Sequence, residues 1–205
     1  THNILAMAAR HSISSDEGMQ KLKEGNGRYV EDKILKPSIN SLQRYELTTG
    51  QNPFAIILNC ADSRVVPELI FDRGIGDLFV IRVAGNIANP SSIASIEYAV
   101  EHIGTNLIVV LGHESCGAVG AAIASYPDGD NGPNLNHLIS FINPAVKAKP
   151  GAPIKEVVEC NAAINATALI SNSDIIRKYV DSGDLKVVPA YYGFTSGKVD
   201  FLNEK

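Results

Sequence analysis

The chain has 205 residues, of which 45% are hydrophobic and 20% are charged, and its formal net charge is -4. This length fits one sizeable domain with a buried core, and the composition is ordinary for a soluble globular protein. The small negative charge gives no reason to expect nucleic acid or an acidic membrane surface as a partner, and no apolar run approaches the length of a membrane span. The cysteine count of three is odd, which argues against a disulfide framework.

The first residue is Thr1 rather than an initiator methionine. Such a start fits either a mature chain whose signal peptide has been removed or a trimmed chain. The sequence therefore leaves the compartment open between the cytoplasm and a periplasmic or organellar space.

The first 50 residues carry only weak periodic patterns, and we expect residues 1–50 to form a helical arm. Ser14 and Glu17 make a capping box, which predicts a helix from this point, after an arm or short helix over residues 1–13. The apolar stripe of the predicted helix is thin and interrupted by glycines, so the helix would be weak alone. We expect it to pack against another surface, such as that of a second subunit.

Buried strands alternate with helices along the rest of the chain. Unbroken apolar runs predict strands, and apolar residues at three- to four-residue spacing predict helices. The predicted strands cover residues 54–60, 77–83, 107–111, 185–192 and 198–202. The predicted helices cover residues 41–48, 68–71, 91–102, 117–122, 135–142, 154–171 and 174–180, with a break over 144–153. This order predicts a single α/β domain over residues 1–205, with a mainly parallel sheet of four strands, an antiparallel edge strand and flanking helices.

Metal-binding side chains follow the first and third predicted strands. Cys60, Asp62 and Arg64 come at the end of the first strand, and extended backbone there would point all three the same way. His113 and Cys116 come where the third strand turns into a helix of small residues. Open α/β sheets bind ligands at the carboxyl ends of their strands, so these residues should converge. A set of two Cys and one His with an open fourth position is typical of catalytic zinc.

The charges of this set predict its chemistry. Zinc held by two thiolates acidifies a bound water less strongly than zinc held by three histidines. We expect Asp62 to accept a hydrogen bond from the hydroxide, and Arg64 to keep Asp62 ionised in a bidentate pair. Each residue also has a plain structural interpretation, since Cys60 alone would be core and the Asp62–Arg64 pair alone a surface salt bridge or helix cap. Cys160 is interpreted as a packing residue of a helix.

Two motifs, CADSR at 60–64 and GHESCGA at 112–118, together resemble those of a known family. The segments DLFVIRVAGNIA at 77–88, SIEYAVEHIG at 95–104 and YYGFTSGKVDFL at 191–202 extend this resemblance over nearly the whole chain. On these motifs the chain resembles the β-class carbonic anhydrases, zinc enzymes that interconvert CO₂ and bicarbonate. The resemblance implies a homodimer, which in this family often pairs into tetramers, with the amino-terminal helix lying across the partner.

The resemblance also implies a role for each site residue. Cys60, His113 and Cys116 match the Zn²⁺ ligands of the family. Asp62 and Arg64 match the catalytic dyad, which would orient a zinc-bound hydroxide toward CO₂. In some family members the aspartate occupies the fourth zinc position and closes the site, so Asp62 is a candidate metal ligand as well.

Two further residues match substrate-binding positions of the family. Gln51 matches a glutamine that contacts substrate, and the Gly117 amide lies where bicarbonate would be held. One departure is that Gly193-Phe194 replaces the Asp-Leu common after the paired tyrosines, which we expect to affect only the local turn. The sequence offers no obvious shuttle histidine, so the route of the proton is not assigned.

Two other functions fit the same residues. The first is a hydrolase of CS₂ or COS, in which a narrow access tunnel would change the substrate but not the site. The second is a non-catalytic zinc-binding regulatory module whose fourth position is closed by Asp62. The intact Asp62–Arg64 pair and Gln51 argue against this module, because a purely structural site has no use for them. A redox role for Cys60 and Cys116 is less favoured, since they lack a CxxC arrangement.

Overall fold

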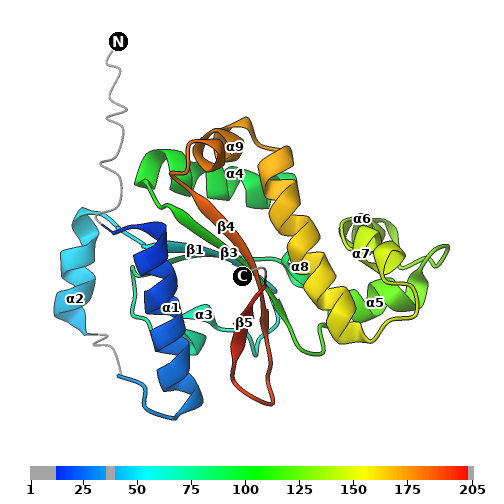
Figure 1. Cartoon of the computed structure of the whole chain (residues 1–205), viewed down its shortest axis with the longest axis horizontal. Coiled ribbons are helices and arrows are strands. Elements are labelled where there is room, and N and C mark those ends of the chain that lie inside the picture. The colour runs from blue at the N-terminus through cyan, green and yellow to red at the C-terminus, as the bar shows by residue number, and fades with distance from the viewer. Residues whose placement is uncertain (1–12, 36–39, 203–205) are drawn as a thin grey trace.

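The structure is a computed structural model that describes residues 13–35 and 40–202 (Figure 1). A five-stranded sheet in the order β2-β1-β3-β4-β5 lies at its centre. The first four strands in the chain are parallel, and β5 pairs antiparallel with β4 at the edge. The predicted α/β domain with four parallel strands and an antiparallel edge strand is confirmed. The strands are β1 (Ala55–Asn59), β2 (Leu78–Arg82), β3 (Leu107–His113), β4 (Lys186–Tyr192) and β5 (Val199–Phe201).

Helices cover both faces of this sheet (Figure 1). They are α1 (Ser15–Val30), α2 (Ser41–Glu46), α3 (Pro67–Ile70), α4 (Pro90–Tyr98), α5 (Gly117–Ser125), α6 (Pro133–Ser140), α7 (Asn143–Ala148), α8 (Ile154–Ser171) and α9 (Asp174–Asp181). Short helical turns lie at Leu47–Thr49 and Ala84–Asn86, and a single π-helical turn at Ala99–Ile103 extends α4. Residues of α1 and α3 pack on one face of the sheet, and residues of α4, α8 and α9 on the other.

The interior strand β1 shows why its sequence is an unbroken apolar run. Successive side chains of a strand point to opposite faces, so a strand covered on both faces needs apolar residues throughout. Ala55 and Ile57 lie in the cluster that contains Leu22 of α1. Ile56 and Leu58 lie in the cluster on the opposite face. All four side chains are fully buried, and this layered core holds the carboxyl ends of β1 and β3 in place.

Helix α1 begins at the predicted capping box and packs closely on its own chain. A Cβ on Gly25 would lie 1.8 Å from the carbonyl oxygen of Phe71, so only glycine allows this approach. The Asn26 side chain donates to the carbonyl of Gly197 at 2.9 Å. Gly25, one of the glycines that weaken the apolar stripe, therefore serves packing within the chain. Packing of the arm on a second subunit stays a prediction, and residues 1–12 of that arm lie outside the described residues.

One predicted boundary is wrong. The sequence predicted a break over residues 144–153, but α7 occupies the first half of this stretch. Pro144 stands in the first turn of α7, where the missing N–H of proline is not needed for a helical hydrogen bond. The proline signal therefore marked the start of a helix rather than a loop, and the actual connection to α8 is shorter than predicted.

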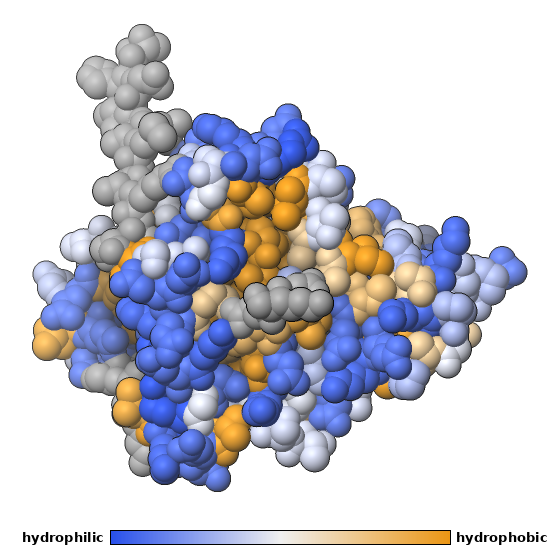
Figure 2. Space-filling model, viewed as in Figure 1, coloured by the Kyte–Doolittle hydropathy of each residue, from blue (hydrophilic) through white to orange (hydrophobic). Residues whose placement is uncertain are grey.

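Within the described residues, none of the helices combines the length and the apolar character that crossing a bilayer requires. Hydrophilic side chains cover α1 on the face shown in Figure 2, whereas more hydrophobic surface gathers over the middle of that face, next to α8. Part of the outer side of α8 forms a shallow groove that Cys160 lines. Cys160 is half-buried and packs against core residues, as predicted.

Candidate metal centre

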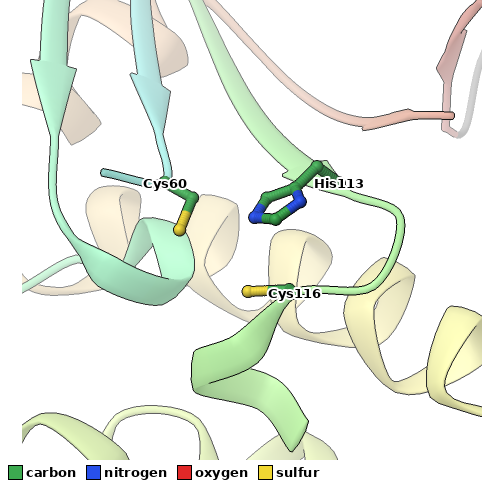
Figure 3. Close-up of side chains that lie close together, drawn as sticks. All are labelled: Cys60, His113 and Cys116. Atoms are coloured by element: carbon green, nitrogen blue, oxygen red, sulfur yellow. The ribbon is translucent and has the colours of Figure 1, made fainter. Parts of the chain in front are cut away.

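Cys60, His113 and Cys116 converge at the carboxyl ends of two neighbouring parallel strands (Figure 3). Cys60 directly follows β1, His113 is the last residue of β3, and Cys116 precedes the first residue of α5. One ligand atom from each of the three lies within 4.8 Å of the other two, and all three residues are buried. The prediction that these side chains meet is confirmed, and the cluster can hold a metal ion.

The turn between β3 and α5 brings His113 and Cys116 to the same point. Ser115 adopts a left-handed backbone conformation with φ of 53°, which reverses the chain within two residues of the strand end. Cys116 then lies at the amino end of α5, where the amides of Ala118 and Val119 face its sulfur and favour the thiolate. These two amides therefore support the Cys116 thiolate.

A backbone amide also contacts the sulfur of Cys60. The N–H of Gly85 donates to the Cys60 sulfur at 3.4 Å. Gly85 has φ of 73°, and a Cβ at this position would lie 2.6 Å from the side chain of Ile142. A side chain here would therefore strain the backbone and displace the amide that stabilises the thiolate.

The two sulfurs compete for one proton. A hydrogen bond from the Cys116 thiol holds the pKa of Cys60 well below its usual range. The same contact with Cys60, together with burial, raises the pKa of Cys116 above its usual range. Two thiolates side by side thus need a positive charge between them, and a divalent cation supplies it.

The imidazole of His113 completes the donor set. Its Nδ1 lies 2.9 Å from the carbonyl oxygen of Glu114. A carbonyl only accepts, so we assign the proton to Nδ1, which leaves a lone pair on Nε2. This Nε2 is buried and has no hydrogen-bond partner among the described residues. An orphaned imidazole nitrogen beside two sulfurs fits Zn²⁺, and the backbone contact to Nδ1 is the usual outer support of a zinc-bound histidine.

Asp62 and Arg64 form a bidentate pair next to this cluster. Arg64 donates from Nε to Oδ1 at 3.0 Å and from Nη2 to Oδ2 at 2.7 Å, and its backbone N–H also bonds Oδ1 at 2.9 Å. These bonds hold the pKa of Asp62 well below its usual range and raise that of Arg64. The Asp62 Oδ2 atom lies 4.0 Å from Nε2 of His113, so the carboxylate borders the metal centre.

The backbone that carries this pair is not extended, contrary to our expectation. The N–H of Val65 donates to the carbonyl of Asp62 at 3.0 Å, which closes a turn directly after Cys60. Arg82 of β2 fixes the turn, because its Nη2 donates to the carbonyls of Ala61 at 3.2 Å and Asp62 at 2.7 Å. The pair forms because a turn brings neighbouring side chains together, whereas two-residue strand spacing would only have aligned them.

Phe194 is a site residue that the sequence analysis missed. The Arg64 guanidinium carbon lies 4.3 Å from the centre of the Phe194 ring, and the His113 ring lies 5.4 Å from it. We had expected the Gly193-Phe194 departure to affect only a local turn. Its position in the chain could have indicated this role. Phe194 follows β4, and the last residue of β4 pairs in register with His113.

The two predicted substrate contacts lie at different ends of β1. Gly117 is exposed beside Cys116, and beyond its own neighbours and helix no atom of the described residues lies within 4 Å of the position that its Cβ would take, so the surface at this residue is open. Gln51 is exposed and precedes β1, whereas Cys60 follows β1. One chain therefore brings Gly117, but not Gln51, to the metal centre.

The fold and the site define a candidate metal-dependent enzyme built on an open α/β sheet, with thiol and imidazole ligands at the strand ends. The sequence model of the carbonic anhydrase family matches residues 55–199. The chain is 38% identical to carbonic anhydrase 2 of Mycobacterium tuberculosis over 181 residues, which cover 86% of this chain and 87% of that relative. It belongs to the β-class carbonic anhydrases, enzymes that hydrate CO₂ reversibly to bicarbonate.

Solved structures agree with this assignment. The chain is similar to the β-carbonic anhydrase CcaA, with 28% identity and a TM-score of 0.69 over 93% of this chain and 90% of that one. It is also similar to the Coccomyxa β-carbonic anhydrase in complex with acetazolamide, with 26% identity and a TM-score of 0.70 over 87% and 83% of the two chains. The resemblance drawn from the sequence motifs is confirmed.

Proposed function

We propose that Cys60, His113 and Cys116 hold one Zn²⁺ ion, and that Asp62 and Arg64 orient water for the hydration of CO₂. When bound, zinc acts as a Lewis acid that makes water a nucleophile near neutral pH. The three protein ligands leave a fourth position for that water, as in other catalytic zinc sites. The buried, unpartnered Nε2 of His113 beside two sulfurs supports this assignment.

The observation that carries the role of the dyad is the engagement of both Asp62 oxygens with Arg64. An ionised carboxylate only accepts hydrogen bonds, so Asp62 would turn the hydrogen of the water toward itself and a lone pair toward CO₂. The bidentate pair fixes the direction of the carboxylate. The same contacts favour this role over that of a fourth metal ligand, because a carboxylate that ligates zinc would have to leave Arg64.

The product of hydration is an anion, and the site has two groups suited to it. Arg64 carries a positive charge that its side chain, 55% exposed, presents to solvent. The amide of Gly117 lies at the open amino end of α5, where anions are favoured. We propose that bicarbonate is held between this amide and the dyad before it leaves.

Gln51 would reach substrate only at the site of a second copy. All of β1 lies between it and Cys60, and at about 3.3 Å per residue the five residues of this strand alone span roughly 16 Å. We therefore propose a homodimer in which Gln51 serves the site of the partner. Mixing Asp62→Asn with Gln51→Ala subunits tests this, because a mixed dimer contains one site with both residues intact. Recovered activity is expected, and no recovery would contradict the shared site.

Metal analysis with X-ray absorption tests the proposed centre. We expect about one zinc per chain, with two sulfur ligands, one imidazole nitrogen and a light fourth ligand. The Asp62→Asn variant should give the same ligand set, because Asp62 is proposed to lie outside it. A chain that binds no zinc, or a spectrum without sulfur ligands, would contradict the proposal. Assays with CO₂ and COS on the same sample separate the two candidate substrates.

A further inference from the structure

Arg64 needs a support that Asp62 alone does not give. The Arg64 side chain is 55% exposed, whereas that of Asp62 is 16% exposed. Exposed ion pairs are weak, and a long arginine side chain loses conformational entropy when it is held in one geometry. A dyad that must orient water needs Arg64 fixed, so its other contacts decide how well the pair keeps its direction.

The Phe194 ring lies against the guanidinium of Arg64, with the guanidinium carbon 4.3 Å from the ring centre. A cation at this distance from an aromatic face is attracted by the negative charge of the ring. The ring is itself fixed, because Tyr192 packs edge-on against it at 5.4 Å between centroids and an angle of 85°. His113 packs on the same ring at 5.4 Å. Phe194 therefore contacts both the guanidinium of the dyad and the ring of a proposed metal ligand.

The loop that carries Phe194 is tied to the turn that carries the metal ligands. The Glu114 carboxylate accepts from the N–H of Thr195 at 3.0 Å and from its hydroxyl at 3.1 Å. The backbone N–H of Glu114 donates to the carbonyl of Tyr192 at 2.8 Å. Glu114 directly follows His113, so these bonds place the ring at a fixed distance from the metal centre.

We propose that Phe194 is a positioning residue of the reaction, which holds the Arg64 guanidinium in plane with the Asp62 carboxylate. The Glu114–Thr195 contacts keep the ring in place. This inference rests on the proposed function, in which Asp62 and Arg64 orient water. It adds Phe194 as a third residue that serves this purpose. It also gives a physical reason for an aromatic residue at this position, because a leucine would fill the space but offer no π face.

The activity test compares Phe194→Leu with Phe194→Tyr in zinc-loaded protein. We expect the leucine variant to lower kcat for CO₂ hydration about twofold to tenfold, and the tyrosine variant to keep it, because only tyrosine retains the ring. Zinc content should be unchanged in both. In an Arg64→Ala background, Phe194→Leu should have no further effect. An equal loss in that background would overturn the proposal, since Phe194 would then act on something other than Arg64.

A second readout does not depend on activity. The Nε–H of Arg64 should exchange slowly with solvent in NMR spectra of the zinc-loaded protein, because it bonds Asp62 beneath the ring. Phe194→Leu should speed this exchange, and Phe194→Tyr should not. Thr195→Val, which removes one contact of the loop, should have a smaller effect of the same sign. Unchanged exchange in Phe194→Leu would overturn the inference. A wild-type chain without CO₂ hydration would instead overturn the proposed function and leave the exchange test valid.

Discussion

The metal centre and the dyad lie side by side but are held by different means. Cys60, His113 and Cys116 are fully or almost fully buried at the ends of central strands, and backbone groups fix them. The Asp62–Arg64 pair lies further out on a turn, and its geometry depends on side chains such as Arg82 and Phe194.

Because of this difference, the positions of the proposed metal ligands and the geometry of the dyad should respond differently to substitution. The ligands are set by the strands and their packing, so changing a neighbouring side chain should leave the metal in place. The dyad is set by hydrogen bonds and a ring contact, so it can be weakened without loss of metal. We therefore expect some variants to lose CO₂ hydration while they keep their zinc.

Removing a ligand should have the largest effect. Cys116→Ala leaves two protein ligands, and we expect zinc content to fall from about one per chain to near zero, with complete loss of CO₂ hydration. The matched control is Cys160→Ala, which removes a thiol outside the cluster and should keep zinc and rate. Metal analysis with a hydration assay measures both. Full zinc in Cys116→Ala would mean that the cluster is not the metal site.

Removing the guanidinium should lower the rate but not the zinc content. Arg64→Ala deletes two charge-assisted hydrogen bonds to Asp62, and we expect a loss of about tenfold to a hundredfold in kcat. Arg64→Lys keeps the charge but not the fork, so its rate should lie between the two. A lysine variant with the full wild-type rate would show that charge alone suffices and that bidentate geometry is unnecessary.

The rate of hydration should rise from neutral to alkaline pH. Two thiolates weaken the Lewis acidity of the metal, so water is activated at higher pH than at a three-histidine site. Asp62 does not set this dependence, because its pKa lies below the usual carboxyl range and it is ionised throughout. Stopped-flow assays across this pH range provide the measurement. A flat profile would contradict this assignment.

A change far from both parts of the site should affect stability alone. Gly25→Ala would place a methyl group 1.8 Å from the carbonyl oxygen of Phe71, and we expect a loss of about 1–3 kcal/mol in the free energy of unfolding. A methyl group at Gly27 on the same helix would meet no described atom outside that helix within 4 Å, so Gly27→Ala should stabilise by about 0.5–1 kcal/mol. Urea unfolding compares them, and equal stabilities would refute the close contact. The rate per zinc should be unchanged in both variants.

The sequence was sufficient to predict the strands and the convergence of the metal ligands. Buried parallel strands have a strong apolar signal, and their carboxyl ends meet at one edge, so Cys60, His113 and Cys116 could be placed together. The turn at Asp62 could not be predicted, because it depends on a contact with Arg82 from another strand. Phe194 was missed for the same reason, since only the fold brings residue 194 to residue 64. The helix at Pro144 was missed because proline both starts helices and breaks them.

The most direct test of the account measures zinc content and CO₂ hydration together in wild type and Asp62→Asn. We expect about one zinc per chain in both proteins, with a rate roughly 10²- to 10³-fold lower in the variant because the water is no longer oriented. Loss of zinc from Asp62→Asn would contradict it and make Asp62 an obligatory metal ligand. A variant that kept both zinc and the full rate would show that the dyad has no part in the reaction.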